Sequence, residues 1–226
     1  MEMAATLIVF HKDIDLVART AFLALTGKMG YQRTLMGLRR FDYFRFLLDL
    51  IPPGDREAAF DELEHALSLQ STFYNQNKHN YFLECSAGEW HRTGGFDLAD
   101  IERRLAREAV SAVGTGKGKK LSGQTPSQEV MFNKDHIFLA EVLVEEIDPR
   151  ALGVLGQKLD GSGGWRGVRF LNRGVLWWLV LRESSIARAE RVVGEITVSE
   201  KRDRGLLLNP NYQRYDLLSL RHLAME

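Results

Sequence analysis

The chain of 226 residues has a mass of 25.7 kDa, which suits one large domain or two small ones. Hydrophobic residues make up 45% and charged residues 27%, a composition that argues against a disordered chain. Lys and Arg total 30, as do Asp and Glu, so the net charge gives no sign of a chain-wide basic surface for nucleic acid.

Cysteine usage and hydropathy indicate in which cellular compartment the protein resides. Cys85 is the only cysteine, which rules out an internal disulfide framework and a cysteine-rich zinc site. No apolar run approaches the roughly 18 residues that a membrane-spanning helix needs. Glu2 places an acidic residue where a signal peptide carries positive charge. We therefore expect a cytoplasmic protein that does not contact a membrane.

The first 91 residues alternate between strand and helix patterns. A short β-branched, apolar run is typical of a buried strand, and apolar residues at helical spacing follow it. We then expect two strands that turn around residues 40–42, a helix capped by Asp55, and a closing strand. The predicted strands are 6–10, 35–38, 43–51 and 81–83, and the predicted helices are 17–25 and 59–67.

The same order returns from residue 134 onward. Pro149 suits the first turn of a helix, and the glycines of 161–164 would end it. A pair of strands turning at 172–174, a second helix and a last strand follow. The predicted strands are 137–144, 166–171, 175–182 and 215–218, and the second helix is 186–196.

Two landmarks set the register of an internal duplication. Asp13-Ile14-Asp15-Leu16 matches Glu146-Ile147-Asp148-Pro149 at an offset of 133 residues. The pattern N-x-N-x-x-x-Y occurs from Asn75 to Tyr81 and again from Asn209 to Tyr215, at an offset of 134. We predict an α+β protein of two tandem ferredoxin-like βαββαβ units, residues 1–91 and 134–226, packed as a pseudo-dimer through their antiparallel sheets.

Residues 92–133 are predicted to link the units. Residues 97–113 place apolar side chains on one face of a charged helix. The stretch 114–120 is rich in Gly and Lys, which indicates a flexible, basic loop. A Walker-type phosphate loop fails here, because the required glycine spacing is missing and no hydroxyl residue follows Lys117 or Lys119.

Each candidate catalytic or metal-binding residue has a simpler explanation. Cys85 and His91 could form a nucleophile and base, but no third residue is placed to orient them, so a structural cysteine is favoured. Glu145-Glu146 and Asp148 could bind metal or transfer protons, yet Asp148 precedes a helix, where capping is commoner. The six histidines lack the spacing of metal ligands. We expect no catalytic residue, metal site or cofactor.

Two strands are rich in aromatic residues. Alternation places Tyr43 and Arg45 on one face of their strand, opposite the phenylalanines at 44 and 46, and it points Trp177 and Trp178 in opposite directions. Neither strand matches the signature of an RNA-binding sheet, so we expect no nucleic-acid partner. One face would pack on helices and the other on the sister sheet or another subunit, which leaves self-association open.

Three segments of the second unit carry a family pattern: Ile147–Ala151 (I-D-P-R-A) opening a helix, Val168-Arg169 with the strand that follows, and Leu206–Tyr215 before the last strand. They resemble the PurS family, the small subunit of phosphoribosylformylglycinamidine synthase. The first is similar to that family's L-D-P-x-G helix start and the second to its second and third strands. The third and most specific resembles its C-terminal L-L-x-N-P-x-x-x-Y. The first unit follows more loosely, with Leu16 and Gln76 in place of the prolines.

The resemblance implies a role rather than a reaction. PurS-like subunits are non-catalytic, dimerise through their sheets, and hold a glutaminase and an ATP-dependent synthetase together so that ammonia passes between them in purine biosynthesis. Two fused copies would form a pseudo-dimer within one chain, as a free subunit or as part of a longer enzyme. Asn75, Tyr81, Asn209 and Tyr215 would fix the turn before each last strand.

A second hypothesis is a regulatory module that binds a small molecule between the two units. It predicts a polar pocket at the pseudo-two-fold axis, and the candidate anion contacts there are Arg39, Arg40, Arg169 and Arg173. An enzyme based on Cys85 or on the acidic cluster is a third and disfavoured hypothesis. The candidate interface or turn residues are Asn75, Tyr81, Asp148, Trp177, Trp178, Asn209 and Tyr215.

Overall fold

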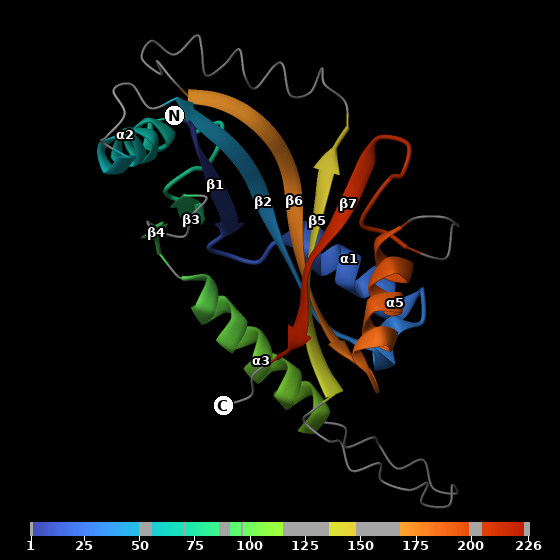
Figure 1. Cartoon of the computed structure of the whole chain (residues 1–226). Coiled ribbons are helices and arrows are strands. Elements are labelled where there is room, and N and C mark those ends of the chain that lie inside the picture. Colours follow the sequence, from blue (N-terminus) through green and yellow to red (C-terminus); the bar gives the residue numbers. More distant parts are fainter. Residues whose placement is uncertain are drawn as a thin grey trace, which may run out of the picture.

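The computed structural model shows helices packed on both faces of one antiparallel sheet, which confirms the predicted α+β class (Figure 1). It describes residues 2–49, 56–69, 71–85, 91–95, 97–114, 136–147, 168–198 and 205–223. The strands are β1 (Glu2–His11), β2 (Leu35–Asp49), β3 (His79–Cys85), β4 (His91–Gly94), β5 (Ile137–Glu146), β6 (Val168–Arg182) and β7 (Gln213–His222). The helices are α1 (Leu16–Gly27), α2 (Arg56–Ser68), α3 (Leu98–Gly114) and α5 (Ile186–Thr197).

Local sequence explains where the helices begin. The Asp15 side chain caps α1 by accepting from the backbone N–H groups of Val17 and Ala18, and Ser185 caps α5 in the same way. The apolar stripes expected from helical spacing are the buried faces. None of the described helices has both the length and the hydropathy to cross a bilayer.

Both predicted strand pairs are wrong, because each is one long strand. β2 runs for 15 residues through the expected turn at 40–42, and β6 runs for 15 residues through the expected turn at 172–174. The described first half is therefore β1-α1-β2-α2-β3, one strand fewer than a βαββαβ unit. The break after residue 51 and Asp55, predicted to cap the next helix, lie outside the described residues.

The seven described strands pair in the order β4-β3-β1-β2-β6-β5-β7. β2 and β6 pair along almost their whole length and form the centre of the sheet (Figure 1). β1 pairs only with the second part of β2, from Asp42 onward, and β5 only with the second part of β6, from Gly174 onward. The first part of β2, Leu35–Phe41, thus has β6 on one side and no described strand on the other.

Two apolar clusters share one face of the twisted sheet. One joins α1 and α5 to β5, β6 and the first part of β2; the other joins α2 to β1, β3 and the second part of β2. The buried Ala18, Ala21 and Leu25 of α1 belong to the first cluster, so a helix of the first half completes the core of the second.

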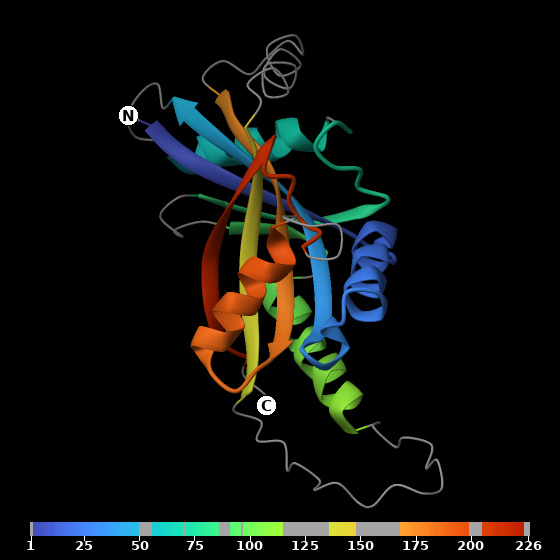
Figure 2. The ribbon, with the colours of Figure 1, turned by 90° about the vertical axis from the view of Figure 1, so that its right-hand side faces the viewer.

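On the opposite face α3 packs against the sheet, where the sequence predicted a sister sheet or another subunit. Trp177 and Trp178 point to opposite faces as expected, and both are buried. Trp178 packs in a cluster with Leu105 and Ala109 of α3, and with Ile8 and Phe10 of β1. In Figure 2, α5 lies in front of β5 and β6, and α3 lies behind them. The predicted amphipathic helix at 97–113 is thus confirmed, whereas the Gly/Lys-rich residues 115–120 lie outside the described residues.

Candidate functional site

A cleft of about 730 Å³ opens where β1 leaves the sheet. Its floor is the unpaired edge of β2 around Leu38 and Phe41, together with Phe10 at the end of β1. One wall is the turn from β1 into α1, and the other is α3, through residues such as Ile101 and Arg104. The volume falls within the range typical of small-molecule sites.

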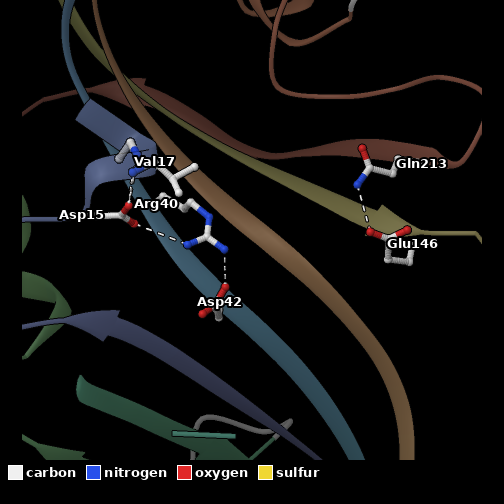
Figure 3. Close-up of polar contacts among 7 residues, drawn as sticks. Asp15, Val17, Arg40, Asp42, Glu146 and Gln213 are labelled. Carbon is white, nitrogen blue, oxygen red and sulfur yellow. Dashed lines mark hydrogen bonds and ion pairs between the residues drawn. The ribbon is translucent and has the colours of Figure 1, made fainter. Parts of the chain in front are cut away.

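Arg40 forms the structural centre of this cleft. Its guanidinium lies 2.6 Å from Asp42 Oδ1 and 3.5 Å from Asp15 Oδ2 (Figure 3). The other oxygen of Asp15 accepts from Val17 N at 2.8 Å, so one carboxylate both caps α1 and ties it to β2. Only 18% of the Arg40 side chain and 14% of the Asp15 side chain are exposed, so this contact serves to hold α1 in place against β2.

Arg39 lies on the opposite face of β2 and reaches α3. Its Nη2 donates to both oxygens of Glu108, at 2.7 and 2.8 Å. The side chains are 44% and 56% exposed, so the pair is weak and open to exchange. Lys12, at the end of β1, donates from Nζ to the Gln76 carbonyl at 2.6 Å.

The described carboxylates of the acidic cluster predicted near the end of β5 accept hydrogen bonds from neighbouring side chains. Glu145 accepts from Arg214 of β7 at 2.9 Å and also bonds Asn172, and Glu146 accepts from Gln213 at 3.0 Å (Figure 3). Among the described residues no group of three His, Cys, Asp or Glu side chains is arranged to hold a metal ion. Asp148 lies outside the described residues.

The four candidate anion-binding arginines do not form one pocket. Arg39 and Arg40 line the cleft, on opposite faces of β2. Arg169 and Arg173 lie on β6: Arg169 pairs with Glu2, and the Arg173 guanidinium sits 5.9 Å from the centre of the Phe44 ring.

The two N-x-N motifs form the same turn. Asn75 Oδ1 accepts from Asn77 N at 2.9 Å, and Asn209 Oδ1 accepts from Asn211 N at 3.1 Å. Each asparagine carbonyl also accepts from the N–H group four residues later, where the strand begins.

The tyrosines that follow these turns lie at equivalent rungs of the sheet. Tyr81 pairs with Val9 of β1, and Tyr215 pairs with Val144 of β5. The Tyr81 hydroxyl donates to Glu64 of α2 at 2.6 Å, and burial together with that carboxylate raises the pKa of Tyr81 well above its usual value.

Cys85 and His91 are not brought together. Cys85 is buried in the cluster beneath α2, whereas the exposed His91 stacks near Phe82 on the other face of the sheet. The indoles of Trp177 and Trp178 are also buried, and the Nε1 of each has no hydrogen-bond partner among the described residues.

Sequence reasoning missed the contribution of α3 to the cleft. Arg104 and Glu108 belonged to the charged face of a predicted linker helix, and no sequence pattern connected that face with the end of β1. Asn80, a buried polar residue that also lines the cleft, carried a clearer signal, because an asparagine within an apolar strand needs a partner or a ligand. No protein-family model, curated protein or solved structure matches the chain.

Proposed function

We propose that the chain is a duplicated PurS-like, non-catalytic scaffold subunit that holds a glutaminase and an ATP-dependent synthetase together in purine biosynthesis. The repeating unit in this proposal is βαβαβ, with β1, β2 and β3 of the first copy equivalent to β5, β6 and β7 of the second. The two copies form a pseudo-dimer, joined through their sheets at β2 and β6.

The observation that carries this proposal is a row of paired residues across the sheet that reads alike from both ends. Reading across six strands, Tyr81 pairs with Val9, Val9 with Asp42, Asp42 with Val175, Val175 with Val144, and Val144 with Tyr215. Asp42 and Val175 are 133 residues apart, the offset of the repeat. A pseudo-two-fold axis between these two residues relates the halves, because each half then offers Tyr, Val and a central residue in the same order.

Three further features support the duplication. β2 and β6 have equal lengths of 15 residues, and β1 and β5 equal lengths of 10. The N-x-N turns before β3 and β7 have the same hydrogen bonds. Joining two copies edge to edge agrees with the sheet-mediated dimerisation that the resemblance implies, and an isologous edge contact is what a two-fold pair requires.

A capture experiment tests the scaffold role. The tagged full chain is used to capture partners from native cytoplasm, with and without glutamine and ADP, and partners are identified by mass spectrometry. We expect a glutaminase and an ATP-dependent synthetase of the purine pathway, at comparable amounts and absent from a control with an unrelated tagged protein. Recovery of neither, with the chain running as a lone monomer, refutes the role.

A cleavage experiment tests the pseudo-dimer separately. A protease site is placed within residues 115–133, and the chain is cut after folding. We expect the two pieces to co-migrate in size-exclusion chromatography, because β2 and β6 pair along almost their full length. The same pieces should separate in urea. Separation in native buffer would exclude a joint sheet even if the capture experiment succeeded.

The second hypothesis, a module that binds a small molecule, draws support from the cleft beside β2. The cleft does not lie on the pseudo-two-fold axis where the sequence placed it, and it need not compete with a scaffold role.

A further inference from the structure

The cleft between the end of β1, the start of α1 and α3 has the dimensions of a ligand site and no part in the scaffold proposal. One of its walls is α3, which lies between the two proposed copies in the sequence. The lining therefore does not follow from the duplication alone.

The charges around the cleft favour an anion. The basic side chains that line it are Lys12, Arg19, Arg39, Arg40 and Arg104, and the acidic ones are Asp13, Asp15 and Glu108. Arg40 is largely buried between Asp15 and Asp42, so these three groups together carry one negative charge. The remaining lining groups carry an excess of two positive charges, which leaves a net charge of +1 and favours an anionic ligand such as a phosphate monoester.

Side chains rather than the helix terminus would bind this anion. Asp15 already accepts from the N–H groups of Val17 and Ala18, so the first turn of α1 offers fewer free donors than an uncapped helix. Arg39 is the best-placed donor, because its pairing with Glu108 is exposed and an incoming phosphate can replace it with a bidentate contact to the guanidinium.

The rest of the cleft is suited to an organic body. On the face of the sheet covered by α3, Phe10 and Phe41 form an apolar floor, and Ile101 adds to one wall. Asn80, only 4% exposed, supplies an uncharged polar group among these side chains. We propose that this cleft binds a small organic phosphate, with the phosphate at Arg39 and Lys12 and the organic part against the floor formed by β1 and β2.

Titration calorimetry on the full chain with phenyl phosphate, inorganic phosphate and phenol tests the proposal. Phenyl phosphate should bind more tightly than inorganic phosphate, and phenol should not bind measurably. Arg39→Ala should weaken the binding of phenyl phosphate about tenfold or more, as expected for loss of a charge-assisted contact. Glu108→Gln should strengthen it severalfold, because Gln removes a competing negative charge while preserving the shape of the side chain.

Arg169→Ala is the matched control. Arg169 is also exposed and pairs with a carboxylate, that of Glu2, but it does not line the cleft. Its substitution should leave the affinity for phenyl phosphate unchanged. The proposal is overturned if phenyl phosphate gives no saturable heat at about 10 mM, if Arg39→Ala and Arg169→Ala weaken binding equally, or if Glu108→Gln weakens it. None of these outcomes depends on capture of a glutaminase or synthetase, so the site and the scaffold role can fail independently.

Discussion

Of two glycines on neighbouring central strands, alanine should destabilise the protein at one and not at the other. A Cβ atom at Gly174 of β6 would lie 2.6 Å from the backbone oxygen of Val144 on β5. A Cβ atom at Gly37 of β2 would lie 3.5 Å from its nearest neighbours, in Leu105 and Val180, which is an ordinary van der Waals distance. Neither glycine has a positive φ, so available space decides the outcome.

Gly174→Ala should lower the free energy of unfolding by about 2 kcal/mol, within the range measured for overpacked cores, because the group that must move is backbone. For a chain of this size the loss corresponds to a fall in Tm of about 4–8 °C. Gly37→Ala should be neutral or raise stability by up to about 1 kcal/mol, since alanine restricts the unfolded chain.

Urea unfolding followed by tryptophan fluorescence measures both variants. The midpoint should shift without a change in slope if only the native state is affected. Equal effects of the two substitutions, or a stabilised Gly174→Ala protein, would refute the close approach of β5 and β6 at this position.

Three further predictions concern the side chains of Asp15, Tyr81 and Glu84. Asp15→Ala should cost about 1 kcal/mol more than Asp15→Asn, because asparagine still caps the helix; chemical denaturation compares the two. Tyr81→Phe should cost about 1 kcal/mol through loss of its hydrogen bond to α2. Tyr215→Phe should cost less, because the Tyr215 hydroxyl makes no hydrogen bond to the described residues, and paired melting curves measure the difference. Burial raises the pKa of the Glu84 carboxyl, so the charged carboxylate destabilises the folded protein at pH values above the pKa of Glu84 in the unfolded chain. Glu84→Gln should therefore raise Tm at pH 7, and this gain should disappear as the pH falls towards 4. A gain in Tm that stays constant across that range would contradict the burial of Glu84.

The sequence located recurring motifs better than it located strands. The offset of 133 residues between the first pair of matched motifs is also the separation of the paired central residues Asp42 and Val175. A recurring motif can be counted because it requires only that similar residues occur twice. Whether a few polar residues between apolar runs form a turn or lie within one continuous strand depends on contacts with residues far away in the chain.

The two false turns illustrate that dependence. The charges at 40–42 resembled a hairpin loop, but Arg40 and Asp42 pair with each other where β1 joins β2, and Phe41 is buried. Gly174 resembled a turn glycine, yet it permits close contact with β5. Polar residues and glycine serve both purposes, so local pattern alone could not distinguish a loop from the centre of a continuous sheet.

The candidate site was harder to predict for a related reason. Arg39 and Arg40 were proposed as anion contacts between the two units, in or beside a predicted turn, and in the structure both line the cleft. The sequence could not indicate that α3 packs across the same strand, because the contacts of a charged amphipathic helix are set by its buried face. The wall formed by Arg104 and Glu108 therefore follows from the packing of Leu105 and Ala109.

The placement of α1 has a consequence for how the chain acquires its structure. The buried face of α1 packs with β5, β6 and α5, which are synthesised more than a hundred residues later. During translation, α1 must wait for these strands before its apolar side chains leave water. Such long-range closure slows folding and should couple both halves into one cooperative transition. The early chain is accordingly the stage at which aggregation competes with folding most strongly.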